Sequence, residues 1–237
     1  MARTGTRLGV LVPSGNVVLE PDMYRMAPPG VTAHFSRVVN SEDTPEQLLR
    51  MIDYVPRCCE ELSHANMDAY AFGCTAGSLM GGVGYDRKIS DLMESLTKKP
   101  STTTSSSVLA GLRELGIQRV SVLTPYEDWL NDLEKTFFEG HGLTVCAIRG
   151  LGFPDPEDIA GTTPDQIVDL VRSVDRPEAQ GIFLSCTDFR AVEALERLER
   201  ELGKPAVSSN QATMWSLLRL AGVRQPVRGF GTLLTRL

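Results

Sequence analysis

The stretch Phe72-Gly73-Cys74-Thr75 returns in similar form as Leu184-Ser185-Cys186-Thr187, 112 residues further along the chain. A second stretch, Leu11-Val12-Pro13-Ser14, returns at the same offset as Leu123-Thr124-Pro125-Tyr126. In each copy the proline and the cysteine are 61 residues apart. Two landmarks at equal spacing, each at the end of an apolar run, favour a duplicated half-domain over coincidence among common turns.

Around these landmarks, short β-branched runs alternate with longer amphipathic stretches. Apolar strands that are each followed by a helix indicate parallel sheets covered on both faces. The predicted strands are Leu8–Val12, Val31–Val38, Asp68–Phe72, Arg119–Leu123, Leu143–Ile148, Gly181–Leu184 and Pro205–Val207. The predicted helices are Thr44–Ser63, Glu127–Glu139, Thr163–Ser173, Ala191–Leu202 and Gln211–Leu220.

The duplication predicts an α/β protein made of two similar half-domains related by a pseudo-two-fold axis. We expect one half-domain to comprise residues 1–105 and 206–237, and the other residues 106–205. Ligands of open parallel sheets bind beyond the carboxyl ends of the strands. Both Cys74 and Cys186 follow such an end, so the sequence predicts two thiols on opposite walls of one cleft.

Composition narrows the classes of partner. The chain has 237 residues, 42% hydrophobic and 23% charged, with a formal net charge of −6, which is typical of a globular protein. Without a run of Lys and Arg, nucleic acid is not an expected partner. No uncharged apolar stretch is long enough to span a membrane, and the N-terminus lacks the apolar segment of a secretory signal. We therefore expect a cytoplasmic protein whose five cysteines are free thiols.

Two thiols facing one ligand suit acid–base or nucleophilic chemistry. Cysteine acts as a thiolate, and backbone N–H groups at a strand-to-helix turn can lower its pKa. The turns after the cysteines, which begin with Thr75 and Thr187, carry small hydroxyl residues that let such groups approach an anion, so Thr75 and Thr187 are predicted to bind the substrate. Asp188 is predicted to cap a helix, and its charge opposes ionisation of Cys186. One thiolate and one thiol would form a matched base and acid. The other cysteines, Cys58, Cys59 and Cys146, are interpreted as packing.

Further polar side chains follow the predicted strands. Ser14 and Asn16 after the first strand can donate to a carboxylate, and Tyr126 stands at the matching place in the second half. Asn210 lies in a third donor-rich turn, which is also consistent with plain helix capping. No metal site is expected, because no Cys-x-x-Cys is present and the three histidines are scattered. Dinucleotide, Walker and Gly-x-Ser-x-Gly motifs are absent, so chemistry without a cofactor is the economical hypothesis.

At these residues the chain resembles the aspartate/glutamate racemase superfamily. Within it, the chain is most similar to maleate cis-trans isomerases and ectoine-utilisation proteins, and more distantly to arylmalonate decarboxylases. The resemblance covers nearly the whole chain. Its motifs are Val12-Pro13-Ser14-Gly15-Asn16, Gly73-Cys74-Thr75-Ala76-Gly77-Ser78, Gly84-Tyr85-Asp86-Arg87, Thr124-Pro125-Tyr126, Ser185-Cys186-Thr187 and Ser208-Ser209-Asn210-Gln211-Ala212.

The resemblance implies a small carboxylate held between two half-domains, no cofactor, and often a homo-oligomer. By analogy with maleate isomerases, the Cys74 thiolate adds to the alkene of a cis-dicarboxylate, the central bond rotates, and Cys186 handles the proton. Asn16 and Tyr126 match positions that hold the substrate carboxylates.

Several activities stay open. In the racemases the two cysteines exchange an α-proton from opposite faces of an amino or hydroxy acid, and the polar stretch Thr75-Ala76-Gly77-Ser78 is racemase-like. The related decarboxylases generally keep only the second cysteine, so the presence of both argues against decarboxylation of an arylmalonate. A carboxylate-binding protein without enzymatic activity is a further alternative.

Overall fold

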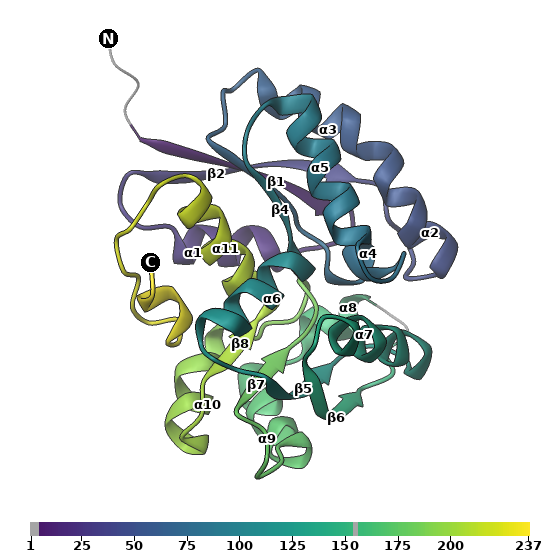
Figure 1. Cartoon of the computed structure of the whole chain (residues 1–237), viewed down its shortest axis with the longest axis vertical. Coiled ribbons are helices and arrows are strands. Elements are labelled where there is room, and N and C mark those ends of the chain that lie inside the picture. Colours follow the sequence, from purple (N-terminus) through teal and green to yellow (C-terminus); the bar gives the residue numbers. More distant parts are fainter. Residues whose placement is uncertain (1–4, 154–155) are drawn as a thin grey trace.

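In the computed structural model, which describes residues 5–153 and 156–237, the chain forms two lobes, each built on a parallel four-stranded sheet (Figure 1). The first sheet has the order β2-β1-β3-β4, and the second has the order β6-β5-β7-β8. The two orders are equivalent when each strand is matched with its counterpart 112 residues or so later, which confirms the predicted two-fold repeat of the fold. The strands are β1 (Thr6–Pro13), β2 (Val31–Val38), β3 (Ala69–Phe72), β4 (Ser101–Thr103), β5 (Arg119–Thr124), β6 (Thr144–Gly150), β7 (Gly181–Leu184) and β8 (Ala206–Ser208).

Helices cover both faces of each sheet and one pair of them joins the lobes. In the first half they are α1 (Leu19–Met26), α2 (Pro45–Arg50), α3 (Val55–Ser63), α4 (Thr75–Leu79), α5 (Tyr85–Thr97) and α6 (Thr104–Glu114). In the second half they are α7 (Asp128–Gly140), α8 (Pro156–Gly161), α9 (Pro164–Val174), α10 (Leu195–Leu202) and α11 (Ser209–Leu220). Short 3-10 helices span Met51–Tyr54, Val192–Ala194 and Leu233–Thr235. Helices α6 and α11 pack against each other between the two sheets (Figure 1).

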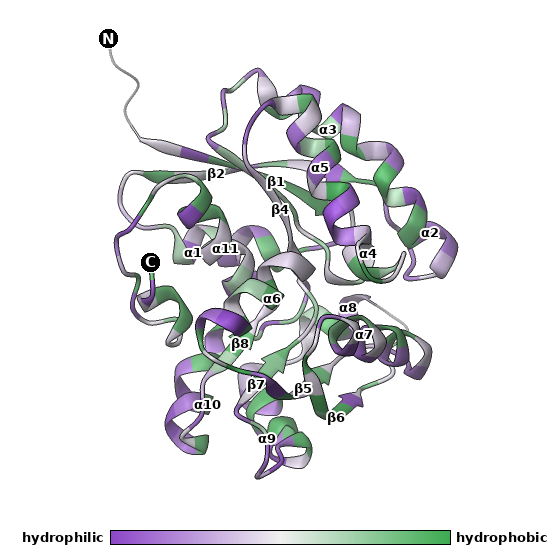
Figure 2. Cartoon of the chain, viewed as in Figure 1, coloured by the Kyte–Doolittle hydropathy of each residue, from purple (hydrophilic) through white to green (hydrophobic). Residues whose placement is uncertain are grey.

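The central strands are apolar because both of their faces are covered. Every residue of β3 and β7 is buried. Figure 2 shows β7 as a hydrophobic segment inside its lobe, whereas the outer helices alternate in polarity. Continuous apolar runs of this kind are what a doubly covered parallel sheet requires.

The seven predicted strands are confirmed to within one or two residues, whereas β4 was missed. Its sequence, Ser101-Thr102-Thr103, is polar throughout, yet all three residues are buried. Helix α6 was missed for the same reason, because its first turn consists of Thr104 and serines. The hydroxyl groups of β4 bond to groups no more than five residues away. Those at the start of α6 also reach distant parts of the chain, as in the bond from Thr104 Oγ1 to the Phe72 carbonyl.

The predicted helix Thr44–Ser63 is interrupted. Thr44 caps α2 by accepting from the Gln47 N–H, as expected, but a 3-10 turn over Met51–Tyr54 separates α2 from α3. Pro56 explains the interruption, because it has no N–H to donate to the preceding helical turn. The division of the chain into half-domains stays a prediction. Strand β8 falls in the segment 206–237 that we assigned to the first half-domain, but it pairs with β7 in the second sheet.

Candidate active site

Cys74 and Cys186 lie at equivalent places in the two lobes and line the same cavity. Cys74 follows β3 and caps α4, where its Sγ accepts from the Gly77 N–H at 3.2 Å. Cys186 follows β7, and its Sγ accepts from the Asp188 N–H at 3.4 Å. The two residues are 7% and 8% exposed, and both line a cavity that is open to solvent at its mouth. The two cysteines, one from each lobe, therefore border a common space.

The backbone at Cys186 is unusual. Its φ angle is +90°, in a region that L-residues with a Cβ atom rarely adopt. Such strain persists only where surrounding contacts enforce it, and it is concentrated at functional sites. The strained backbone is therefore a second indication, separate from the sequence repeat, that Cys186 belongs to a functional site.

The expected lowering of the cysteine pKa values is wrong for this structure. Burial raises the pKa of Cys74 to about 12, with a further increase from the Asp43 carboxylate, and the Gly77 N–H offsets only part of it. Burial and the Asp188 carboxylate hold the pKa of Cys186 well above its usual value. One N–H donor per sulfur is too little to compensate for removal from water. Both groups are thiols at neutral pH, so a thiolate has to form as a step of the reaction.

Asp188 acts differently from the sequence prediction. It does not cap a helix of its own lobe. Its Oδ1 accepts from the Val17 and Val18 N–H groups at 2.9 and 3.1 Å, ahead of α1 in the other lobe. Its opposition to ionisation of Cys186 is as expected.

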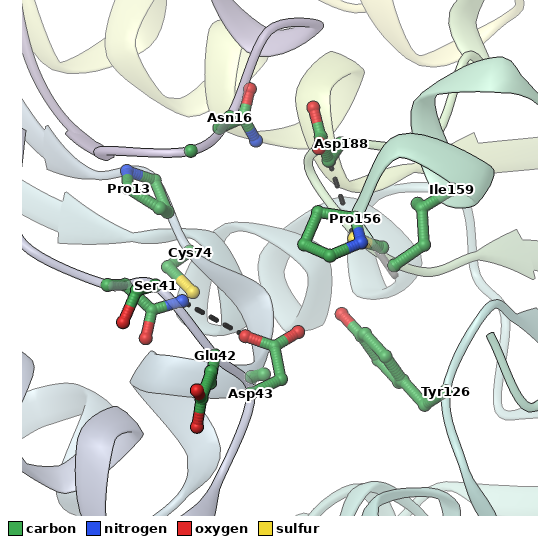
Figure 3. A pocket seen from close by; sticks show the side chains of 14 residues that line it. Pro13, Asn16, Ser41, Glu42, Asp43, Cys74, Tyr126, Pro156, Ile159 and Asp188 are labelled. Carbon is green, nitrogen blue, oxygen red and sulfur yellow. Dashed lines mark hydrogen bonds between the residues drawn. The ribbon is translucent and has the colours of Figure 1, made fainter. Parts of the chain in front are cut away.

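Asn16 and Tyr126 line the cavity, as the sequence predicted for substrate-binding residues. The Asn16 Oδ1 accepts from the Val18 and Leu19 N–H groups, and its Nδ2 donates to Thr187 Oγ1 at 3.1 Å. This leaves one N–H of the amide for a ligand, and Figure 3 shows the amide nitrogen on the cavity side. Burial and the nearby thiols hold the pKa of Tyr126 well above 10, so its hydroxyl is a neutral donor beside Cys186.

The side chains of the other four predicted binding residues are not among those that line the cavity. Ser14 bonds to the backbone of Asn40, and the Thr75 hydroxyl contacts Ser209 Oγ at 2.9 Å. Thr187 donates to the Gly73 carbonyl. Asn210 Nδ2 donates to Asp22 Oδ2 at 2.8 Å and to the Thr187 carbonyl at 3.0 Å. These side chains hold the walls of the cleft, and their participation in binding stays a prediction that would run through backbone groups.

The structure adds a loop that the sequence reasoning missed. Residues Asn40, Ser41, Glu42 and Asp43 line the cavity together with Pro156 and Ile159 of α8. A signal was available, because this polar run follows β2 at the same sheet edge as Cys74. Asn40 Nδ2 donates to Asp43 Oδ1 at 3.0 Å. Although Asp43 as a residue is exposed at the mouth, enough protein surrounds its carboxyl group for desolvation to raise its pKa.

A buried acid stands behind Cys186. Glu134 of α7 is inaccessible to solvent and accepts a bond of 2.6 Å from Ser185 Oγ, one residue before the cysteine. Burial raises the pKa of Glu134 to about 8, so the group is largely protonated at neutral pH. It supports the turn that carries Cys186 without adding a full negative charge.

Neither a metal-binding cluster nor a membrane-spanning helix is found in the described ranges, residues 5–153 and 156–237. No cluster of three or more His, Cys, Asp or Glu side chains is arranged to hold a metal ion there. Nor does any helix in these ranges combine the length and the apolar character that crossing a membrane requires.

Comparison with known proteins relates the chain to enzymes of two kinds. The family profile of arylmalonate decarboxylase matches residues 8–234. The arylmalonate decarboxylase of Bordetella bronchiseptica is 32% identical over 94% of this chain and 91% of that protein. The maleate isomerase Iso of Pseudomonas putida S16, in a cysteine-to-alanine variant crystallised with maleate, superposes with a TM-score of 0.94 at 28% identity over 98% of both chains.

A third relative bears on the role of cysteine. A cysteine-to-serine variant of the Nocardia farcinica maleate cis-trans isomerase carries a covalently bound succinylcysteine intermediate. It superposes with a TM-score of 0.91 at 25% identity over 97% of this chain and 98% of that one. The profile match covers nearly the whole chain, and the chain therefore belongs to the arylmalonate decarboxylase family.

Proposed function

We propose that the protein is a cofactor-independent cis-trans isomerase of a small (di)carboxylate, similar to maleate isomerase, in which Cys74 is the nucleophile and Cys186 transfers the proton. The observation that carries this proposal is the pair of cysteines, one from each lobe, that line a single cavity. The succinylcysteine intermediate of the Nocardia relative supports covalent addition of a cysteine to an alkene.

The chemistry needs two groups and no external electron carrier. The Cys74 sulfur bonds to one alkene carbon, while the π electrons move to the neighbouring carbon. That carbon is stabilised by its carboxylate and takes a proton from the Cys186 side. The proton that Cys74 loses replaces the one that Cys186 delivers in this step. The central bond is now single and rotates. Return of the proton and cleavage of the C–S bond restore the alkene in the trans form, so no net oxidation occurs and both thiols are regenerated.

The cavity supplies donors where charge develops. The Tyr126 hydroxyl and the free N–H of Asn16 can bind the carboxylate that accepts the electron pair, and neither group carries a charge that must be neutralised. Fixed donors of this kind, in a site that excludes water, stabilise a developing oxyanion strongly. Formation of the Cys74 thiolate is then coupled to substrate binding, because the thiol is protonated beforehand.

A second candidate is decarboxylation of a substituted malonate, which the 32% identity with the Bordetella enzyme favours. Decarboxylation requires only Cys186 to protonate the enediolate and places solvent hydrogen on carbon. Isomerisation by addition and rotation returns the substrate carbon skeleton intact. Assembly as a homo-oligomer and a cytoplasmic location accompany the proposal as predictions from the sequence.

Substitution of each cysteine tests the assignment. Cys74→Ser and Cys186→Ser should each lower turnover by roughly 10³-fold, because serine is a much weaker nucleophile and acid. The readout is proton NMR in deuterated water with maleate, small cis-alkenoates, arylmalonates and chiral amino acids. Cys59→Ser, in the core of the first lobe, is the matched control and should stay active. Full activity in either active-site variant contradicts the proposal, and release of carbon dioxide that survives Cys74→Ser establishes the decarboxylase instead.

A further inference from the structure

The charge of the cavity does not suit a dicarboxylate. Three acids line it, Glu42, Asp43 and Asp188, and no Lys, Arg or His is among the described residues of the lining. The guanidinium of Arg37 lies near the same loop, but it donates to the carbonyls of Ser14 and Asn16 and pairs with Glu20 at 2.7 Å. Its charge is therefore already engaged, and a second substrate carboxylate would enter a site of its own sign.

Asp43 and Asp188 both act on the two thiols, and Asp43 is the one whose carboxylate is turned toward Tyr126. The Oδ1 atom of Asp188 accepts from the N–H groups of Val17 and Val18 and so holds this carboxylate toward α1. In Figure 3 the Glu42 carboxylate points away from Tyr126, whereas that of Asp43 extends toward the space between Cys74 and Tyr126. The charge of Asp43 acts on both thiols and on the Tyr126 phenol, so Asp43 influences the reacting groups from the mouth of the cavity.

Asp43 is held in this position by Asn40. The Asn40 Nδ2 donates to Asp43 Oδ1, whereas the Asn40 Oδ1 is buried without a hydrogen-bond partner in the described part of the chain. A buried oxygen without a hydrogen-bond partner lowers stability, so it needs a structural reason. We attribute it to the orientation of the Asn40 amide, whose nitrogen must face the Asp43 carboxylate. Among the hydrogen bonds of the described residues, none reaches the other carboxylate oxygen, Oδ2, so this oxygen is left to accept from a ligand.

From this geometry we propose that the substrate carries a protonated primary amine that binds Asp43, while its single carboxylate binds at Asn16 and Tyr126. This inference rests on the proposed isomerase function and narrows its substrate to small cis-alkenoates with an ammonium group. Addition of the Cys74 sulfur needs only one conjugated carboxylate to accept the electron pair, so the second carboxylate of maleate is dispensable. The ammonium group also offsets the negative charge of the thiolate that must form.

A matched pair of unreactive ligands tests the proposal by binding alone. Succinate and 4-aminobutanoate have the same four-carbon chain and differ in carrying a carboxylate or an ammonium group at one end. Dissociation constants are measured by calorimetry for the wild type, for Asp43→Asn, and for Glu46→Gln, which removes an exposed acid three residues further along the chain and outside the cavity lining. We expect the wild type and Glu46→Gln to bind 4-aminobutanoate at least roughly tenfold more tightly than succinate, as a charge-assisted hydrogen bond provides. Asp43→Asn should abolish or invert this preference.

The proposal is overturned if the wild type does not bind 4-aminobutanoate more tightly than succinate, or does not bind it detectably. It is also overturned if Asp43→Asn keeps the wild-type ratio of the two dissociation constants. The turnover of cis-4-aminobut-2-enoate and maleate is then compared by NMR. The two ligands do not react, so their dissociation constants test the ammonium site alone. The isomerase mechanism is tested separately by turnover in Cys74→Ser, where unchanged activity would contradict it.

Discussion

At position 186 a cysteine occupies a backbone conformation that suits glycine. The φ angle of +90° brings the Cβ atom against the backbone, and the conformation directs the sulfur into the cavity beside Tyr126. The folded chain keeps this strain because the ends of the turn are held by the Ser185 N–H bond to Leu123 and by the Asp188 carboxylate. The backbone conformation of Cys186 therefore lowers the stability of the fold and places its thiol in the cavity.

Substitution of Cys186 by glycine should relieve this strain. Cys186→Gly is expected to be more stable than Cys186→Ala by about 1 kcal/mol, because glycine adopts positive φ without a steric penalty. Both variants lack the thiol, so they form a matched pair that separates backbone strain from side-chain packing. Urea unfolding of the two proteins measures the difference. A Cys186→Ala protein that is as stable as Cys186→Gly would show that the φ angle carries no strain.

Among the elements, α7 and β7 are joined beneath the site by a buried acid. Glu134 of α7 accepts from Ser185 just after β7, and its second oxygen is buried without a partner among the described residues. Its folded pKa of about 8 exceeds the ordinary value of 4.5, so the folded protein holds a proton that the unfolded chain releases. The resulting stabilisation is complete below pH 4.5 and is lost as the pH rises to about 8.

This linkage predicts a pH dependence that a neutral side chain removes. The free energy of unfolding should lose roughly 2–4 kcal/mol from Glu134 between pH 4.5 and pH 8. Glu134→Gln should show a correspondingly flatter profile in urea titrations at a series of pH values. Glu139→Gln, an exposed position on the same helix, should follow the wild-type profile. An identical slope for Glu134→Gln and the wild type would be incompatible with a protonated Glu134.

On the scale of the whole molecule, the two lobes are connected by side chains that surround the cleft. Asn210 on α11 donates to Asp22 of α1 and to the Thr187 carbonyl of the second lobe. Asn16 and Thr187 make a further link between the lobes at 3.1 Å. The cleft between the cysteines therefore depends on polar contacts between residues more than 150 positions apart in the chain, and the Asn210–Asp22 bond is one of them.

Removal of the Asn210 side chain should lower the stability of the protein more than it weakens substrate binding. Asn210→Ala leaves Asp22 Oδ2 and the Thr187 carbonyl without this donor, at a cost of about 2 kcal/mol. In a chain of this size such a loss lowers the melting temperature by roughly 5 °C. Calorimetry measures the shift, and KM for the isomerised substrate is measured alongside it. An unchanged melting temperature combined with a raised KM would instead support direct contact of Asn210 with the substrate.

Much of the fold was predictable because burial leaves a strong pattern in a parallel sheet. Runs such as Gly181–Leu184 are apolar on both faces, so their positions were confirmed almost residue by residue. Polar elements such as β4 and the start of α6 escaped prediction because they lack an apolar pattern. The hydroxyls of α6 are satisfied in part by groups that only the folded chain brings near. The same argument applies to the site. The cysteines converge because duplicated strands end at equivalent edges, whereas Thr75 and Asn210 turn their side chains into the walls.

The sequence by itself determined the duplication, the parallel sheets and the meeting of Cys74 with Cys186, since spacing and apolar runs are local properties of the chain. Only the tertiary structure decided the protonation of the thiols, the strain at Cys186 and the approach of Asp43 to the reacting groups. Desolvation and electrostatic fields are summed over neighbours from both lobes, and those neighbours are distant in sequence. The electrostatic character of the cleft is therefore a property of the folded molecule rather than of any motif within it.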